Sequence, residues 1–260
     1  MSMLHSMLIL IMGSIIGAVA AYLGSLMLSK RMALVGGALG HLALPGIALA
    51  IIYQIDISLG ALFFLIIGIS IIWGLEQRTK LPLEALTAVV FAISLACAFL
   101  LLPIEQAEQA LVGEITKVTP LMALFAIILA CAIWYLTYSI MADIVLMSIS
   151  EDLASVEKIP CNKRKFLYLA GIALIIALGV RIIGGLMTAA LIAIPACTAR
   201  NMCLSLRGYT WLSFLNGFLS CFIGILISFW FAIASGPAII ITSGVLFLLS
   251  VIGKRSHVHG

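Results

Sequence analysis

His41 is the residue of this sequence whose type and position most clearly suggest chemistry. It lies in the stretch GGALGHLALPGIALA (residues 36–50), near the centre of a long apolar run. A polar side chain at mid-membrane depth is costly and normally faces protein or a water-filled cavity. Pro45 has no N–H for the carbonyl of His41, and Gly36 and Gly40 form a GxxxG step that allows close helix approach. The stretch predicts a broken helix that borders a pathway; a kinked helix whose histidine bonds to a neighbouring helix is the alternative.

A second stretch, GGLMTAALIAIPACTAR (residues 184–200), repeats this pattern. It begins with two glycines and contains Pro195, which removes the helical partner of the carbonyl of Leu191. Broken backbone at membrane depth is tolerated where it lines a cavity. We therefore expect a second break on the same pathway, with a kink that serves only packing as the alternative.

Enzyme chemistry has no support in the sequence. The motifs GxxxxGK[ST], GxSxG and HExxH do not occur, and no nucleophile–base pair is apparent, so neither ATP hydrolysis nor intramembrane catalysis is expected in this chain. Acidic residues are scarce within the apolar runs. Glu84 follows Pro82 in what is predicted to be the first turn of a helix, where a carboxylate is ordinary. This scarcity counts against a proton-driven carrier, which needs ionisable groups at membrane depth.

The composition identifies the elements that must carry these residues. Of 260 residues 64% are hydrophobic and 9% are charged, against about 25% charged in soluble domains. A helix crosses the hydrocarbon core in about 20 residues, so we expect an all-α, polytopic membrane protein that forms one transmembrane domain over residues 1–260. Nine spans are predicted, with eight or ten as alternatives, at residues 7–28, 33–53, 58–75, 81–103, 118–140, 166–180, 183–199, 209–233 and 237–252.

The basic residues predict the orientation of these spans. If nine spans alternate, twelve of the 14 lysines and arginines fall on one side: Lys30, Arg31, Arg78, Lys80, Lys158, Lys163, Arg164, Lys165, Arg200, Arg207, Lys254 and Arg255. The other side receives only Lys117 and Arg181. The positive-inside rule then places the amino terminus outside and the carboxyl terminus in the cytoplasm.

The one sizeable cytoplasmic region is predicted at about residues 141–165. Ser150 is a good helix N-cap, and Glu151 and Asp152 place negative charge in the first turn. Leu153 and Val156 are three residues apart and therefore share a helix face.

We expect a helix of about two turns that ends before Pro160, because proline biases the preceding residue away from helix. Its apolar face suits a groove on a cytoplasmic partner, and a helix lying at the lipid headgroups is the alternative.

Several stretches together resemble the membrane subunit of the zinc/manganese/iron permease family of ATP-binding-cassette importers. They occur in order over nearly the whole chain: RMALVGGALGHLALPGIALA (31–50), LVGEITKVTP (111–120, more loosely), SISEDLASV (148–156), GGLMTAALIAIPACTAR (184–200) and SGPAIIITSGVLFLLS (235–250). The resemblance implies a multi-pass protein of the cell membrane that forms a homodimer on two copies of a separate cytoplasmic ATPase subunit. It also implies delivery of the substrate, zinc, manganese or iron, by an extracytoplasmic solute-binding protein.

The resemblance also implies residue roles. The loop with SISEDLASV carries the helix that couples to the ATPase, so Ser150, Glu151, Asp152, Leu153 and Val156 become the coupling residues. ATP acts in the partner, no cofactor is expected in this chain, and nucleic acid is not a partner.

The family's second span commonly has an aspartate four residues before its histidine, but here Gly37 occupies that position and His41 alone remains as a metal ligand. A permease of the same architecture with a non-metal or altered substrate is therefore the alternative function. A stand-alone channel or secondary carrier is another, although such a protein needs no docking helix.

Overall fold

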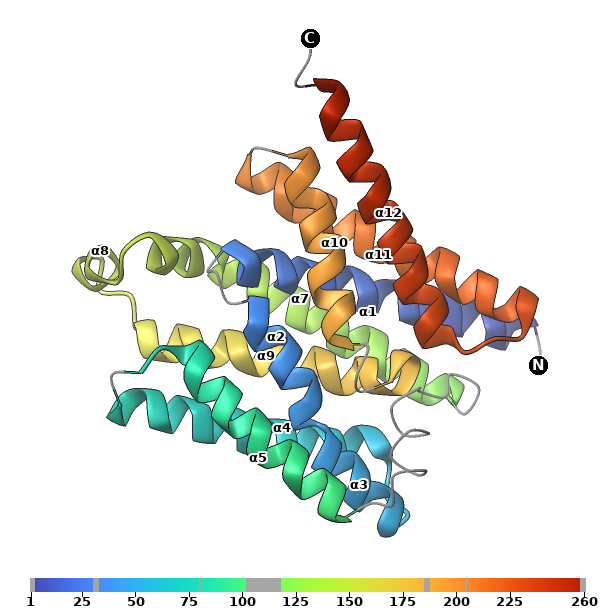
Figure 1. Cartoon of the computed structure of the whole chain (residues 1–260), viewed down its shortest axis with the longest axis horizontal. Coiled ribbons are helices and arrows are strands. Elements are labelled where there is room, and N and C mark those ends of the chain that lie inside the picture. The colour runs from blue at the N-terminus through green and yellow to red at the C-terminus, as the bar shows by residue number, and fades with distance from the viewer. Residues whose placement is uncertain are drawn as a thin grey trace.

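The computed structural model describes residues 3–29, 33–79, 81–101, 118–184, 188–203 and 205–257. The regular structure in these ranges is entirely helical (Figure 1). The helices are α1 (Met3–Ser29), α2 (Ala33–Leu42), α3 (Leu44–Ile52), α4 (Ile57–Arg78), α5 (Leu83–Leu101), α7 (Pro120–Ile149), α8 (Glu151–Val156), α9 (Cys161–Ile183), α10 (Thr188–Met202), α11 (Leu206–Phe231) and α12 (Ser235–His257).

The helices agree with the predicted class of all-α membrane protein. Six of them, α1, α4, α5, α7, α11 and α12, are long and apolar enough to cross a membrane. The predicted spans at 33–53, 166–180 and 183–199 correspond to the divided pair α2 and α3, to α9, and to the short α10. The count of nine crossings and the orientation of the termini stay predictions. Lys30, Arg31, Lys80 and Lys117 lie outside the described residues, as does most of the LVGEITKVTP stretch.

Polar side chains fix where several helices begin. Asp56 accepts a hydrogen bond from the N–H of Ser58 at 2.9 Å at the start of α4, and Ser205 accepts one from the N–H of Gly208 at 3.2 Å at the start of α11. Thr119 does the same for α7, where Pro120 occupies the first helical position. These caps satisfy N–H groups that have no partner within the helix, and proline is favoured at this position because its missing N–H costs nothing there.

α1 is the central helix of the molecule, buried along most of its length. It packs against α7, α9, α10 and α11. A Cβ added at Gly17 would lie 2.9 Å from the carbonyl oxygen of Gly217, so α1 and α11 meet with their backbones in near contact. Two buried hydroxyls reinforce the packing of α1: Ser213 donates to the carbonyl of Ala21 at 2.6 Å, and Tyr168 donates to the carbonyl of Leu23 at 2.8 Å. Small residues and interhelical hydrogen bonds are the usual means by which helices associate in lipid.

The helices α3, α4 and α5 form a separate group along one edge of the molecule (Figure 1). Within the described residues they pack on one another and reach the rest of the molecule mainly through α9 and α2. α2 crosses the molecule from this group to α10, as the blue and orange ribbons show in Figure 1. The segment with His41 thus joins the α3–α5 group to the main bundle.

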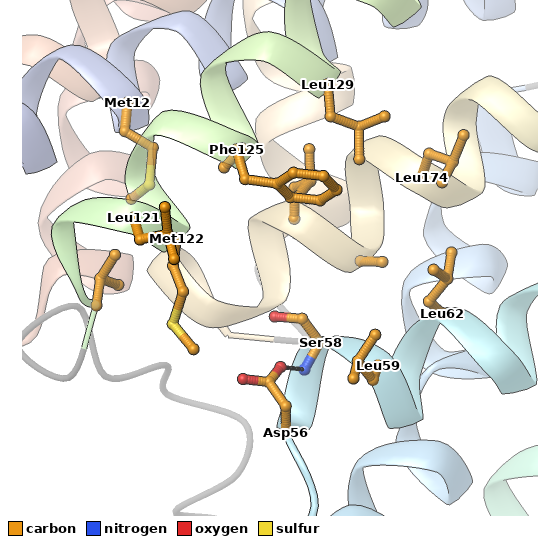
Figure 2. A pocket seen from close by; sticks show the side chains of 14 residues that line it. Met12, Asp56, Ser58, Leu59, Leu62, Leu121, Met122, Phe125, Leu129 and Leu174 are labelled. Atoms are coloured by element: carbon orange, nitrogen blue, oxygen red, sulfur yellow. Dashed lines mark hydrogen bonds between the residues drawn. The ribbon is translucent and has the colours of Figure 1, made fainter.

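A cavity of about 520 Å³ separates part of the α3–α5 group from the main bundle. Figure 2 shows its lining, which is apolar apart from Asp56 and Ser58 at the start of α4. Met12 comes from α1, Phe125 from α7 and Leu174 from α9. Since the first turns of α4 and α7 and the second half of α9 line it, the cavity lies at the end of the bundle away from α8.

Candidate functional site

The apolar run with His41 is divided into two helices, as its proline predicts. α2 ends at Leu42 and α3 begins at Leu44, with Pro45 in its first turn. Ala43 between them keeps helical dihedral angles, φ −70° and ψ −23°, and accepts a hydrogen bond from the N–H of Ile47 at 2.9 Å. The division is therefore a kink in a nearly continuous path, because Pro45 removes one donor and its ring crowds the preceding turn.

His41 lies one turn before Pro45 and is half-buried. Its ring packs against Phe91 of α5, with centroids 4.9 Å apart and planes tilted by 58°. Nδ1 is shielded from solvent and has no hydrogen-bond partner among the described residues. A buried ring nitrogen without a partner is uncommon, since polar atoms removed from water are nearly always hydrogen-bonded. The imidazole thus retains coordinating or hydrogen-bonding capacity.

The glycines around His41 differ in what surrounds them. Gly36 and Gly40 are buried, and a Cβ at Gly36 would lie 3.3 Å from Cε of Met27 on α1. A Cβ at Gly37 would meet nothing within 4 Å. The position four residues before His41 therefore has open space where a Cβ would lie.

Pro195 does not divide its helix, which differs from the expectation of a second break. α10 runs from Thr188 to Met202 with Pro195 buried inside it. The hydroxyl of Thr198, in the turn that follows Pro195, donates to the carbonyl of Ile194 at 2.9 Å. Neighbouring helices and Ser/Thr hydroxyls commonly preserve a membrane helix around proline. The described residues hold no cluster of three or more His, Cys, Asp or Glu side chains that could bind a metal, so His41 is not part of such a cluster there.

The predicted coupling residues lie in an abrupt corner between α7 and α9. Ser150 ends α7, since its N–H donates to the carbonyl of Leu146 at 3.0 Å. The same residue begins α8, because its Oγ accepts from the N–H of Leu153 at 3.3 Å and its carbonyl accepts from the N–H of Ala154. With one residue shared as the cap of both helices, α8 leaves α7 without a linker.

α8 buries one side and exposes the other. Ala154 is fully buried, whereas Leu153 and Val156 are 54% and 77% exposed. Asp152, on the same short helix, is also exposed. Two apolar side chains thus face outward from the end of the molecule that Figure 1 shows projecting on the left.

The end of α8 differs from the prediction that Pro160 terminates it. The helix ends at Val156, and Lys158 follows with a left-handed φ of 56°, which the N–H of Ile159 stabilises by donating to the carbonyl of Ala154 at 3.0 Å. Pro160 instead occupies the N-cap position of α9, without a side-chain hydrogen bond. A residue with positive φ just beyond the helix is a common way for a helix to end, and it does not need a proline.

Charged residues at the start of α9 make contacts that sequence reasoning did not detect. Nζ of Lys165 lies 2.6 Å from Oε1 of Glu76 at the end of α4, and Nε of Arg164 lies 2.8 Å from Oδ2 of Asp143 near the end of α7. These partners are 89 and 21 positions apart in the sequence. The only signal in the sequence for these ion pairs was the presence of Glu76 and Asp143 near the ends of spans three and five. Sequence spacing alone cannot tell which lysine or arginine each of them contacts.

Comparisons with known proteins agree with this architecture. The family model described as "ABC 3 transport family" matches residues 3–254. The zinc uptake system membrane protein ZnuB of Haemophilus influenzae is 27% identical over 256 residues, covering 95% of this chain and 96% of that protein. The manganese import system permease protein ScaB of Streptococcus gordonii is 26% identical over 245 residues, covering 93% and 88% of the two chains.

A solved structure, PsaBC from Streptococcus pneumoniae in complex with Fab, superposes with a TM-score of 0.79 at 25% identity. The match covers 93% of this chain and 89% of the other. Because the family model spans nearly all of the chain and the helices are of membrane-crossing composition, this chain belongs to the ABC 3 transport family and is a multi-pass membrane permease subunit.

Proposed function

We propose that this permease carries a divalent transition metal into the cell, with zinc and manganese as the first candidates. The supporting observation is the similarity, over almost the full length of both chains, to a zinc uptake protein and a manganese import permease. ATP is bound and hydrolysed by a separate subunit, and this chain provides the path across the membrane. A metal-uptake assay in proteoliposomes that contain the permease and its ATPase, supplied with the solute-binding protein, tests the proposal, and uptake of neither metal would contradict it.

His41 is the residue that meets the metal in this proposal. Its half-buried ring, the unpartnered Nδ1 and the kink at Ala43 support a position on the pathway. Imidazole suits zinc and several other first-row metals, but one neutral ring makes a weak site. We infer that His41 of a second copy of the chain completes the site across a homodimer. His41→Ala should then reduce metal uptake. The mass of the purified dimer, which reports assembly of the permease, should stay unchanged.

Gly37 favours one alternative, a permease of the same architecture with another substrate. No carboxylate lies one turn from His41 to compensate the charge of a divalent cation. An uptake panel that compares zinc, manganese and iron with uncharged and organic solutes separates the two proposals. Uptake of a non-metal solute with no response to metals would favour the alternative.

We also propose the orientation and the count of nine crossings that the basic residues predict. The six long apolar helices account for six crossings. The pair α2 and α3, counted as one, and the helices α9 and α10 bring the number to nine. The amino terminus and the turn at residues 53–56 then face outward, where a solute-binding protein delivers the metal. The α8 corner faces the cytoplasm.

α8 is proposed as the helix that inserts into the ATPase subunit. The exposed Leu153 and Val156 support this, because two apolar side chains on a short helix that is fixed at both ends suit a hydrophobic groove. Ser150 caps this helix at the end of α7, and we propose that Glu151 and Asp152 in its first turn belong to the coupling segment. Retention of the ATPase subunit on the purified permease is the direct test, and it should be lost when both apolar side chains are replaced by aspartate.

A further inference from the structure

The α3–α5 group is attached to α9 very differently at its two ends. At the end near α8, the last turn of α4 contacts the first turns of α9 through two polar contacts. Glu76 binds Lys165 at 2.6 Å, and Oε1 of Gln77 accepts a hydrogen bond from Asn162 at 3.2 Å. At the other end, the cavity of about 520 Å³ lies between the two helices, lined by Leu62 of α4 and Leu174 of α9 (Figure 2). The attachment is therefore tight near α8 and open away from it.

The Glu76–Lys165 pair is well shielded from water. The two side chains are 16% and 19% exposed. In such surroundings an ion pair is held firmly, because separating the charges leaves each of them poorly solvated. Arg164, the neighbour of Lys165, is bound in turn to Asp143 of α7. The first turns of α9 thus hold the ends of α4 and α7 together, directly beneath the α8 corner.

We propose that the Glu76–Lys165 ion pair is the positioning link that transmits movement of α8 to the α3–α5 group and thereby to the kink beside His41. This inference rests on the proposed docking of α8 to the ATPase. Lys165 lies nine residues after Val156, on a helix joined to α8 by a short, hydrogen-bonded turn. A displacement of α8 therefore moves the start of α9, and the ion pair makes the end of α4 follow.

The α3–α5 group has the contacts needed to carry this displacement onward. α3 and α4 approach so closely at Gly46 and Gly60 that a Cβ at Gly60 would lie 2.7 Å from Cβ of Ala50. α5 carries Phe91, whose ring contacts His41. The kink at Ala43 separates α3, which packs on α4 and α5, from α2, which packs on both α5 and α10. The cavity at the far end leaves α4 room to tilt relative to α9 when its near end is moved.

The experiment measures transport and ATP hydrolysis together in the assembled transporter. Lys165→Met and Glu76→Gln should each lower the metal carried per ATP hydrolysed by roughly 5-fold or more, the range of typical coupling between sites. The KM for ATP and retention of the ATPase subunit should stay at wild-type values, because α8 is untouched. Lys163→Met is the matched control: it removes the same charge from an exposed position two residues earlier, and should transport normally.

Two double variants separate transmission from simple stabilisation. The reversed pair Glu76→Lys with Lys165→Glu restores the attraction and should recover coupling. The neutral pair Glu76→Gln with Lys165→Met leaves no unpaired buried charge, so it should assemble well yet remain uncoupled. Wild-type coupling in the neutral pair would overturn the inference and leave the ion pair a purely structural role.

The proposed docking of α8 and the ion-pair link can be contradicted by different results. If aspartate at Leu153 and Val156 leaves ATPase retention and coupling intact, the docking proposal is wrong. If that variant loses the ATPase while Lys165→Met couples normally, docking stands and the ion-pair link is wrong.

Discussion

At the scale of single residues, the environment of His41 depends on neighbours that are remote in sequence. Phe91 contacts one face of its ring, and Met27 lies beside Gly36 one turn away. The glycine at position 37, in contrast, has no neighbour within 4 Å of its missing Cβ. Position 37, four residues before the histidine, therefore has open space where a Cβ would lie. The sequence has glycine there, so it supplies no second ligand at this spacing.

Gly37→Asp should create a metal site of higher affinity. A carboxylate four residues before an imidazole lies on the same helix face, and it adds the negative charge that a divalent cation needs. We expect zinc or manganese to bind the purified permease at least about 10-fold more tightly, equivalent to about 1.4 kcal/mol. Isothermal titration of wild type and variant measures this.

Gly37→Asn is the control for that substitution. It has nearly the same size and also a side-chain oxygen, but no charge, so it should bind metal much more weakly than the aspartate variant. Equal metal affinity in wild type and Gly37→Asp would contradict the assignment of His41 to the pathway.

At the scale of elements, α8 shows how little chain is needed to fix a short helix. Ser150 caps two helices at once, and the turn after Val156 is closed by the bond from Ile159 to Ala154. Six residues form no stable helix alone, since helix nucleation is costly and isolated helices need about 12 or more residues. The burial of Ala154 and the two flanking helices supply the missing stability.

Val156→Asp should uncouple hydrolysis from transport without unfolding the spans. The side chain is 77% exposed, so the free molecule gains no buried charge, but a docked α8 would place the carboxylate in an apolar groove. We expect at least about a 10-fold loss of transport, corresponding to about 1.4 kcal/mol of docking energy. Ser155→Asp adds the same charge to an exposed polar position of α8 and should have much less effect. Normal transport by the Val156 variant would exclude docking through this residue.

Gly60→Ala should destabilise the α3–α5 group. The added methyl would contact the carbonyl of Gly46 and Cβ of Ala50, and such overpacking typically costs about 1–3 kcal/mol. Gly74→Ala, on the same helix, meets nothing within 4 Å and should be neutral or stabilising by about 0.5–1 kcal/mol through helix propensity. Thermal unfolding in detergent compares the two. A lower melting temperature for Gly74→Ala than for Gly60→Ala would contradict the close packing of α3 on α4.

At the scale of the whole molecule, α1 organises the bundle and α9 joins it to the α3–α5 group. The α8 corner and the cavity lie at opposite ends of this arrangement. If the basic residues face the cytoplasm, α8 does so too, and the turn between α3 and α4 lies outside.

Cysteine labelling in intact cells tests that orientation. In a variant whose six native cysteines are replaced, a cysteine at Gln54 should react with an impermeant maleimide, and one at Ser155 should react only after the cells are opened. Both positions are exposed, so accessibility within the fold is matched. Labelling of Ser155→Cys in intact cells together with protection of Gln54→Cys would show that the orientation is the reverse of the proposed one.

Local patterns were sufficient for the helices and for several of their ends. Apolar runs of membrane length predicted the all-helical class, Pro45 predicted the kink in its own helix, and Ser150 with Leu153 and Val156 predicted α8 and its exposed apolar side. These features depend on bonds within a few residues, where chain geometry alone decides. The resemblance of five stretches likewise identified the family that the comparisons confirm.

Tertiary structure alone decided which distant residues meet. The pairing of Glu76 with Lys165, the ring of Phe91 against His41 and the cavity between α4 and α9 join positions far apart in the sequence. Pro195 shows the same limit, because its local pattern matched that of Pro45, yet α10 is continuous with Pro195 buried inside it. The energy of such contacts depends on the helix arrangement, which periodicity and composition do not encode.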